Sequence, residues 1–481
     1  MMRSFDIFDT LIARRCIEPH GIFRAVELRS GLADFFNQRI AAERRLCDAP
    51  YTLDDIYAQL QSITGVDDAR MAELKDIEID EELRNAIPIQ ENISQVRDGD
   101  ILVSDMYLPQ EVIRGLLTRA GCGRETPIIV TSHGKSRGHI WPVLKQNLDI
   151  DFHTGDNLHS DIQSAQAHGI EARYTQVAKL NTVETFLMTV GLHQLCQLIR
   201  ELRLSQHDED LQVRNWRHMQ CQFNIPLLVL SSIHILSECE RLQRKTVQFS
   251  SRDCYFLKRV FDSLNREAPE IASAYFYTSR IARLSRSEDY TRYVRTCVTG
   301  ESLIVDLCGT GWSLGAMLEN AGVTAPFHLV HDISGGALTS HYSHIRKVHL
   351  PHDRSFLLKD AGLNNSVFEQ FNYVDHGSII DVKHIPEVNQ FIPLQQEPDY
   401  PPEIRMCIRT TEALVDQFDK ICRSYDMPAL ISEAMALGDQ FKDIFRVLYE
   451  HALENASFTP AFAQYHAAED ALVFARLKNG L

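Results

Sequence analysis

Four short segments in the N-terminal part of the chain carry side chains that can handle a phosphate group. They are FDIFDTL at 5–11, ILVSDMYL at 101–108, GKSRG at 134–138 and HTGDNLHSD at 153–161. Their reactive side chains are Asp6, Asp9, Thr10, Ser104, Lys135, Asp156 and Asp161. A carboxylate can attack phosphorus and divide a difficult hydrolysis into two steps. Phosphoryl transfer also needs positive charge on the equatorial oxygens, which a lysine and a divalent cation supply.

The predicted secondary structure explains how these segments come together. Short apolar runs predict strands, and amphipathic segments between them predict helices. The strands are 3–8, 100–104, 126–131 and 151–155, and the helices are 109–121 and 139–148. Alternating strands and helices indicate a parallel sheet whose strand C-terminal ends lie along one edge, so we expect the four segments to meet there. Helical periodicity over 16–95 predicts a cap above the same edge.

In this order, the four segments resemble the motifs of phosphatases of the haloacid dehalogenase (HAD) superfamily, over residues 1 to about 185. The resemblance implies a Rossmann-like α/β fold in which Asp6 is the nucleophile. Ser104 and Lys135 would hold the phosphoryl oxygens, and Thr10 would contact the substrate. Lys135 would also offset the charge of Asp6, with Lys145 as the alternative lysine.

Magnesium is the cofactor that this resemblance implies. Its ligands would be Asp6, the backbone carbonyl of Phe8 and Asp156, with Asp161 in support. Phe8 is also a departure, because most phosphatases of the family carry an acid at that position to protonate the leaving group. Asp9, one residue further on, is either a substitute acid or a residue that braces the loop. The metal motif favours phosphatase over dehalogenase chemistry, since dehalogenation needs no Mg²⁺.

The C-terminal half has one informative segment, SLIVDLCGTGWSLGAML at 302–318. An apolar strand ends in Asp306, and a glycine-rich turn then leads into a helix. Glycines at such a turn allow backbone N–H groups to face an anion at the helix N-terminus. The residues of this turn are Gly309, Thr310, Gly311, Trp312 and Ser313. Because this turn follows a strand, we expect Gly311→Val to block anion binding and to leave the fold intact.

Two further segments precede this turn. FSSRDCYFLKRVF at 249–261 puts Arg252 and Asp253 at a strand-to-helix turn, and YTSRIARLSR at 277–286 forms a basic loop with Arg280, Arg283 and Arg286. Strands are predicted at 246–251, 273–279, 302–311 and 326–334.

The order of these segments over about 245–340 resembles the pyrophosphate loop, basic lid and ribose-phosphate loop of phosphoribosyltransferases. The resemblance implies that Arg252 and Arg280 stabilise departing pyrophosphate with Mg²⁺, that the glycine-rich turn holds the 5-phosphate of phosphoribosyl pyrophosphate (PRPP), and that Asp306 holds the ribose hydroxyls. Leu307 stands where that family often has a second acid. The alternative is a methyltransferase-like motif for S-adenosylmethionine, although its glycines are normally spaced more widely and open the domain.

Together the two halves resemble bacterial two-domain ribofuranosyltransferases of polysaccharide (O-antigen or capsule) synthesis. The resemblance implies transfer of 5-phosphoribosyl from PRPP to a glycan acceptor, such as a lipid-linked oligosaccharide, and removal of the 5-phosphate to leave a β-ribofuranosyl residue. Asp253 and Glu369 are the candidate general bases. The alternatives are a single-function sugar-phosphate or nucleotide phosphatase with a ligand-binding or methyltransferase-like C-terminal domain, and a phosphate-sensing regulator.

The expected architecture is α/β: a HAD Rossmann-like domain with a helical cap, plus a second α/β phosphoribosyltransferase-like domain with helical additions. The predicted boundaries are 1–195 for the phosphatase with its cap at about 16–95, 196–245 for a helical connector, 246–400 for the second α/β domain and 401–481 for a helical region.

Composition narrows the setting of the protein. The formal net charge of −16 argues against nucleic acid or anionic membrane as a nonspecific partner. Eleven cysteines without CxxC pairs predict reduced thiols in the cytoplasm. The N-terminus predicts no secretory signal, and the apolar run 225–236 predicts a core helix rather than a transmembrane segment. A lipid-linked acceptor would allow peripheral association with the inner membrane.

Overall fold

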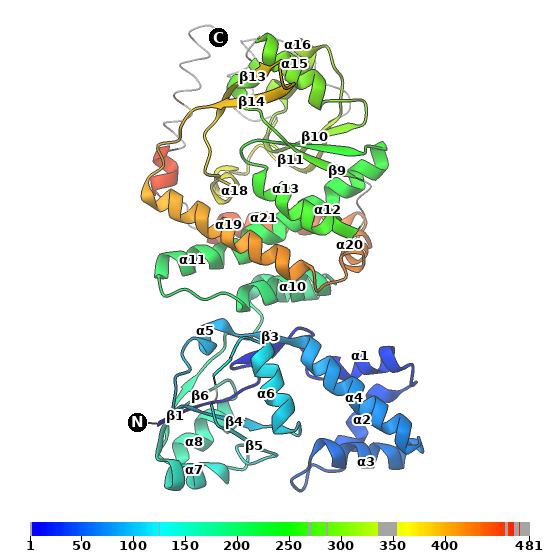
Figure 1. Cartoon of the computed structure of the whole chain (residues 1–481), viewed down its shortest axis with the longest axis vertical. Helices are drawn as coiled ribbons and strands as arrows, with labels where there is room; N and C mark the ends of the chain where they lie inside the picture. Colours follow the sequence, from blue (N-terminus) through cyan, green and yellow to red (C-terminus); the bar gives the residue numbers. More distant parts are fainter. Residues whose placement is uncertain are drawn as a thin grey trace. The chain divides into compact units, whose positions relative to one another are not determined.

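The chain divides into two compact units, each built around a parallel sheet (Figure 1). The first unit comprises residues 1–181 and 203–209, and the second comprises 182–202 and 210–481. The computed structural model describes residues 2–124, 126–267, 271–284, 287–334, 354–456, 460–465 and 471. The division therefore differs from the single boundary at residue 195 that the sequence predicts, because 182–202 belongs to the second unit and 203–209 returns to the first.

The first unit contains a five-stranded parallel sheet in the order β5-β4-β1-β6-β7. Its strands are β1 (Met2–Phe5), β4 (Ile101–Asp105), β5 (Ile128–Thr131), β6 (Ile150–Gly155) and β7 (Glu171–Tyr174). Helices α6 (Gln110–Arg119), α7 (Ile140–Leu148) and α8 (Ser164–Ala167) connect them. The predicted strands and helices of this sheet domain are confirmed, whereas β7 and the short strands at 12–14 and 86–88 were not predicted. The strand order reverses between β1 and β6, and ligands bind outside the strand ends at such a switch point.

The predicted helical block forms a separate layer beside this sheet (Figure 1). It consists of α1 (Gly21–Ser30), α2 (Phe35–Arg44), α3 (Leu53–Thr64) and α4 (Asp68–Asn85). The chain enters it through β2 (Ile12–Arg14) and returns through β3 (Ala86–Pro88), which pair antiparallel, before the short α5 (Gln90–Ile93). Arg14 forms a buried ion pair with Glu82 of α4 at 2.8 Å, which fixes the entering strand to the last cap helix.

The second unit contains another five-stranded parallel sheet in the order β12-β11-β10-β8-β9. Its strands are β8 (Thr246–Ser250), β9 (Ala272–Phe276), β10 (Ser302–Gly309), β11 (Phe327–Asp332) and β12 (Arg354–Lys359). The first four confirm predicted strands. The switch point lies between β8 and β10, which precede the two turns with candidate anion-binding residues.

Helices and a hairpin surround this second sheet. The helices next to it are α13 (Tyr255–Leu264), η3 (Asn265–Glu267), α14 (Arg280–Leu284), α15 (Glu288–Cys297), α16 (Trp312–Ala321) and α18 (Ser366–Phe371). The hairpin of β13 (Ile379–Ile385) and β14 (Gln390–Gln395) was not predicted, and it packs on α14 and α15. The C-terminal helices are α19 (Pro402–Cys422), α20 (Met427–Met435) and α21 (Gln440–Asn455), as the sequence predicts.

Residues 196–245 differ from the predicted connector, because most of them belong to the core of the second unit. The helices in and before this region are α9 (Thr182–Thr189), α10 (His193–Leu204), α11 (Leu211–Met219), η2 (Gln220–Asn224) and α12 (Ile225–Leu242). Helix α12 is apolar around its circumference and packs on α13, which is typical of a core helix.

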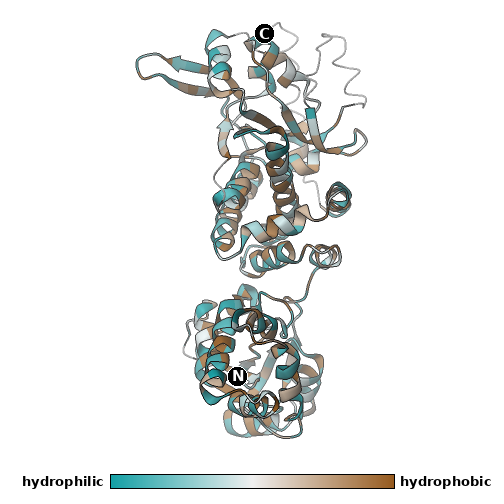
Figure 2. Cartoon of the chain, turned by 90° about the vertical axis from the view of Figure 1, so that its right-hand side faces the viewer, coloured by the Kyte–Doolittle hydropathy of each residue, from teal (hydrophilic) through white to brown (hydrophobic). Residues whose placement is uncertain are grey.

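The continuous helix Leu211–Leu242 is also the one described segment long and apolar enough to cross a membrane, and 83% of its apolar window is buried inside the unit. Most other helices are amphipathic, and Figure 2 shows mixed teal and brown residues along them. Their buried faces therefore pack against the sheets or against other helices.

Gly311 occupies a packed position, which corrects the expectation that its substitution spares the fold. Its φ of +74° lies in the left-handed region that favours glycine. A Cβ atom on Gly311 would lie 2.5 Å from Cε2 of Phe327, and the Phe327 ring is fully buried in β11. The turn after β10 folds back against the neighbouring strand, so a larger side chain has no space.

We predict that Gly311→Val destabilises the second unit by roughly 2–4 kcal/mol, because backbone strain adds to overpacking. Urea unfolding followed by circular dichroism would measure the loss. Gly300→Val is the matched control, since a Cβ atom there would meet nothing within 4 Å. An unfolding midpoint for Gly311→Val equal to that of the control would contradict this packing.

Candidate active site

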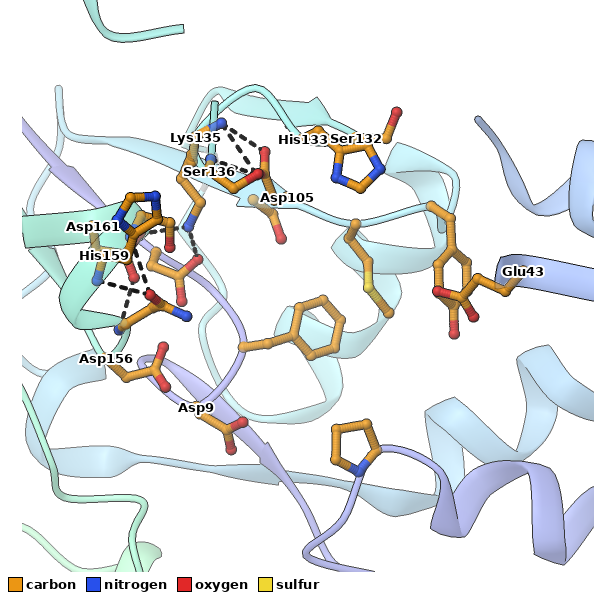
Figure 3. Close-up of a pocket in the computed structure, with 18 of the residues that line it drawn as sticks. Asp9, Glu43, Asp105, Ser132, His133, Lys135, Ser136, Asp156, His159 and Asp161 are labelled. Carbon is orange, nitrogen blue, oxygen red and sulfur yellow. Dashed lines mark hydrogen bonds and ion pairs between the residues drawn. The ribbon is translucent and has the colours of Figure 1, made fainter. Parts of the chain in front are cut away.

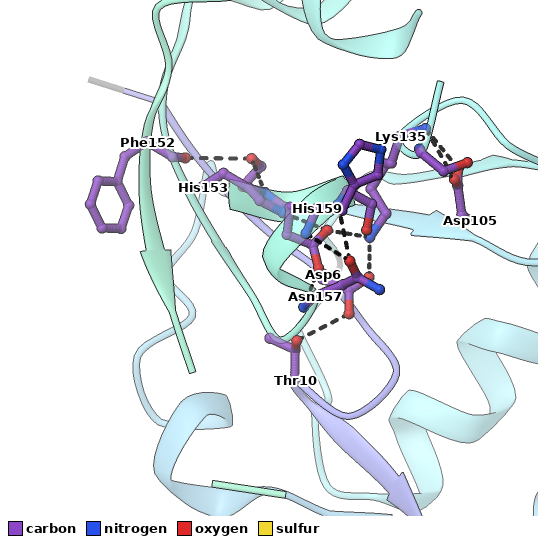
Figure 4. Close-up of polar contacts among 12 residues, drawn as sticks. Asp6, Thr10, Asp105, Lys135, Phe152, His153, Asn157 and His159 are labelled. Carbon is purple, nitrogen blue, oxygen red and sulfur yellow. Dashed lines mark hydrogen bonds and ion pairs between the residues drawn. The ribbon is translucent and has the colours of Figure 1, made fainter. Parts of the chain in front are cut away.

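Asp6 lies at the C-terminal end of β1, where its carboxylate is buried and held on both oxygens (Figure 4). Its backbone N–H donates to the carbonyl of Thr154 at 2.8 Å, which joins the β1 end to the β6 end. The Thr10 hydroxyl donates to Oδ2 of Asp6 at 3.0 Å. The Lys135 ammonium donates to Oδ1. These contacts fix the orientation of the predicted nucleophile.

Lys135 is the cation of this site, as the sequence predicts. Its buried Nζ bridges Asp6 and Oδ1 of Asp161, the latter at 2.8 Å. Burial by itself would lower the pKa of Lys135, but the two carboxylates raise it, so the lysine stays charged. The alternative, Lys145, is more exposed and donates to the carbonyl of Gly169, away from this cluster.

Asp105 supports the loop that carries Lys135, and it was not among the residues predicted from the sequence. Its carboxylate accepts hydrogen bonds from the backbone N–H groups of Lys135 at 2.9 Å and Ser136 at 3.0 Å, and from the Thr131 hydroxyl. The sequence could have indicated this role, because Asp105 directly follows Ser104 at the end of a predicted strand. A carboxylate there can anchor the neighbouring loop of a parallel sheet.

Asp161 lies at the centre of the acidic end of the site. Its Oδ2 accepts from the backbone N–H of Asn157 at 3.0 Å, and Nε2 of His153 lies 3.3 Å from its Oδ1. Burial opposes ionisation, but Lys135 and His153 hold the pKa of Asp161 below its usual range. A Cβ atom on Gly155 would lie 2.4 Å from the Asp161 side chain, so the glycine allows this close approach.

Three carboxylates form the one group of described residues that could hold a metal ion. The ligand atoms of Asp6, Asp156 and Asp161 all lie within 4.8 Å of one another. Burial and then the charges of Asp6, Asp9 and Asp161 raise the pKa of Asp156 to about 8, while burial raises that of Asp6 to about 7. A bound cation would relieve this repulsion, and hard oxygen ligands suit Mg²⁺ or a similar ion. The carbonyl of Phe8 stays a predicted ligand.

A cavity of about 560 Å³ opens between the sheet edge and the cap (Figure 3). Phe8, Asp9 and the buried Ser104 line it on the sheet side. Asp9 has a φ of +55°, and its backbone N–H donates to the carbonyl of Ile12 at 2.6 Å. Both predicted roles of Asp9 therefore stay open, since it borders the cavity and its backbone also braces the loop.

In the second unit, most of the predicted residues lie at or after the C-terminal ends of β8, β9 and β10. Arg252 and Asp253 follow β8, with Nε of Arg252 3.5 Å from Oδ1 of Asp253. Burial and then the charge of Asp253 raise the pKa of Glu369 to about 8, against the opposing charges of Arg280 and Arg252. Glu369 is therefore within electrostatic range of these sequence-predicted residues. Arg286 lies outside the described residues.

Arg283 has contacts that the sequence analysis did not foresee. Its buried guanidinium forms an ion pair with Asp306 at 2.9 Å and donates to the hydroxyls of Thr278 at 3.0 Å and Ser313 at 3.3 Å. Arg354 of β12 donates to the carbonyl of Thr310 at 3.1 Å. The glycine-rich turn, with Trp312 as the first residue of α16, is therefore held by two arginines from other elements.

No family model matches this chain, and no curated protein matches its sequence. Its chemistry is therefore inferred from its own residues. In the first unit these are a buried carboxylate bridged to a lysine, two further carboxylates and a cavity under a helical cap. In the second unit they are acids and arginines at a sheet switch point. Both arrangements are suited to anionic, phosphate-bearing ligands.

Proposed function

We propose that the first unit is a magnesium-dependent phosphatase with Asp6 as its nucleophile. The observation that carries this proposal is the Lys135 bridge between Asp6 and Asp161 beside Asp156, at the floor of a cavity. An oxygen of Asp6 attacks phosphorus while the bond to the ester oxygen breaks, and the departing alkoxide takes up a proton. Water then attacks the aspartyl phosphate, which releases inorganic phosphate and restores the carboxylate.

The surrounding residues divide the remaining work. Thr10 orients Asp6, while Lys135 and Ser104 hold the phosphoryl oxygens. Asp6, Asp156 and Asp161, with the carbonyl of Phe8, would hold Mg²⁺, and the bound ion would supply positive charge that offsets the charge of the transferring phosphoryl group. Asp9, which lines the cavity, is the candidate proton donor for the leaving oxygen, because Phe8 has no proton to give.

We further propose that the second unit transfers 5-phosphoribosyl from PRPP to a glycan hydroxyl. The acceptor oxygen attacks C1 with inversion, pyrophosphate departs, and Asp253 or Glu369 takes the hydroxyl proton. Arg252 and Arg280 stabilise the pyrophosphate, while Asp306 and the turn from Gly309 to Ser313 hold the ribose and its phosphate. The first unit then removes the 5-phosphate to leave a β-ribofuranoside, on a cytoplasmic, lipid-linked acceptor.

One observation favours a second candidate function, a phosphatase whose second unit only binds a ligand. Arg283 forms an ion pair with Asp306 and donates a hydrogen bond to Ser313, and both residues are assigned to PRPP. PRPP would therefore have to compete with Arg283 for these two side chains. Mass spectrometry of a synthetic glycan incubated with PRPP separates the two functions. A transferase adds a ribosyl unit to the glycan, whereas a ligand-binding unit leaves its mass unchanged.

We predict that Asp6→Asn blocks dephosphorylation and leaves transfer intact, because the nucleophile and the PRPP residues belong to different units. The glycan should then accumulate as a product about 212 Da heavier, the mass of one phosphoribosyl group, since no aspartyl phosphate can form. Asp151→Asn, on the same sheet, should give the dephosphorylated product like the wild type. Ribosylated product without phosphate from Asp6→Asn would contradict the role of Asp6.

We predict that Asp156→Ala weakens magnesium binding, because it removes one of three clustered carboxylates. Thermal unfolding should show that Mg²⁺ raises the wild-type midpoint, and that the variant needs at least about tenfold more Mg²⁺ for the same rise. Dephosphorylation should recover in part at the higher concentration. Asp151→Ala is the matched control from β6, and equal Mg²⁺ dependence in the two variants would exclude this carboxylate as a ligand.

A further inference from the structure

The cavity of the first unit has two chemically different ends. Lys135 and the metal-binding carboxylates line the sheet end, whereas His20, Phe23, Glu43 and Tyr51 line the cap end. Figure 3 shows Glu43 on the opposite side of the cavity from Asp156 and Asp161. A volume of about 560 Å³ is more than a phosphoryl group and one pentose fill, and it lies within the roughly 300–1,000 Å³ of typical ligand pockets. The cap end therefore has space for whatever is attached to the pentose.

Glu43 is held rigidly at this end. Its Oε2 accepts from Nη1 of Arg39 at 2.9 Å, and its Oε1 accepts from the Tyr51 hydroxyl at 3.0 Å. The side chain of Glu43 stays 25% exposed, while that of Arg39 is fully buried. Each carboxylate oxygen has a second lone pair, so Glu43 can still accept hydrogen bonds from a ligand.

The charge of this group is not balanced. Arg39 also forms a bidentate ion pair with the fully buried Glu78, at 2.9 and 2.8 Å, so one guanidinium serves two carboxylates. Arg14, which also lines the cavity, is paired with Glu82. The cap end thus presents a net negative carboxylate to the cavity, opposite the end that attracts phosphate.

Aromatic rings and backbone contacts shape the wall beside Glu43. The Tyr51 ring stacks on Tyr107 with centroids 6.4 Å apart and meets the His133 ring edge-on at 5.5 Å. The backbone N–H of Tyr51 donates to the Ser132 hydroxyl at 2.9 Å, and that of Leu53 donates to the carbonyl of Tyr107 at 3.0 Å. The cap wall is therefore fixed to the sheet domain, with rings that can pack against a sugar face and a carboxylate that can accept from its hydroxyls.

We propose that the cap end of this cavity, where Glu43 faces the Asp6–Lys135 pair, admits a 5-phosphoribosyl group joined to a neutral sugar and rejects PRPP. With the 5-phosphate at Lys135, the substituent on C1 of the ribose extends toward the cap. A neutral sugar there donates hydroxyls to Glu43, whereas the pyrophosphate of PRPP meets a carboxylate of like charge. This inference rests on the proposed phosphatase function, and it explains how one chain would protect its donor from its own phosphatase.

The test compares hydrolysis of the 5-phosphate in PRPP and in a synthetic 5-phospho-β-ribofuranosyl glucoside. The full chain with fixed Mg²⁺ is used, and ³¹P NMR follows the 5-phosphate separately from pyrophosphate. The wild type should prefer the glucoside in kcat/KM by roughly 100-fold, and Glu43→Gln should reduce this preference at least about tenfold. Glu43→Asp keeps the charge and should retain most of the preference. Glu73→Gln, an exposed cap residue, is the matched control and should leave the preference unchanged.

The outcomes separate this inference from the function beneath it. A wild type that hydrolyses both compounds equally well overturns the inference and leaves the phosphatase standing, as does an unchanged preference in folded Glu43→Gln. A wild type that hydrolyses neither compound overturns the phosphatase itself, and the inference with it. If Glu43→Gln does not fold, the inference is tested by the other two proteins. A wild type without a preference for the glucoside, or a folded Glu43→Asp variant that loses most of the preference, then overturns it.

Discussion

The first unit depends on one buried lysine. Lys135 bridges Asp6 and Asp161, whose carboxylates would otherwise repel each other in a region with little water. A buried charge is tolerated only when it is paired and hydrogen-bonded, so the lysine, its loop and the two strand ends must be arranged together. Asp105, which fixes the lysine loop through backbone N–H groups, is part of the same requirement.

The lysine only partly offsets the acids around it. Burial and then the charges of Asp6, Asp9 and Asp161 raise the pKa of Asp156, and a divalent cation would offset this negative charge. The cap end of the cavity also has more carboxylates than cations, because Arg39 forms ion pairs with both Glu78 and Glu43. In our proposal, the unbalanced charge at each end would place a cation and phosphate at the sheet end and neutral polar groups at the cap end of the cavity.

Both units form their candidate sites at a sheet switch point. In the first unit the switch brings the ends of β1 and β6 together, and in the second it brings together those of β8 and β10. The two candidate sites differ in the basic residue that pairs with their carboxylates. In the first unit a lysine lies between two acids, whereas in the second Arg283 holds Asp306 and Ser313 together. Any ligand that Asp306 binds must therefore share it with a guanidinium.

The sequence by itself determined the strands that precede the candidate residues, most of the cap helices, and the choice of Asp6, Lys135, Asp156 and Asp161, which the structure brings together. It could do so because apolar periodicity and strand-end motifs are local properties. It did not reveal Asp105, the pairing of Arg283 with Asp306 or the Arg39–Glu43–Glu78 group, because each joins side chains from different elements. The same reason explains Gly311, whose turn looked open in sequence until Phe327 of the adjacent strand filled the space beside it. Likewise, the apolar run 225–236 indicated a core helix, but the sequence placed it in a connector, and only its packing against α13 showed that α12 belongs to the second unit. Local sequence patterns thus indicated which residues could react. Tertiary contacts determined which charges are paired, which side chains are neighbours and how much space surrounds each one.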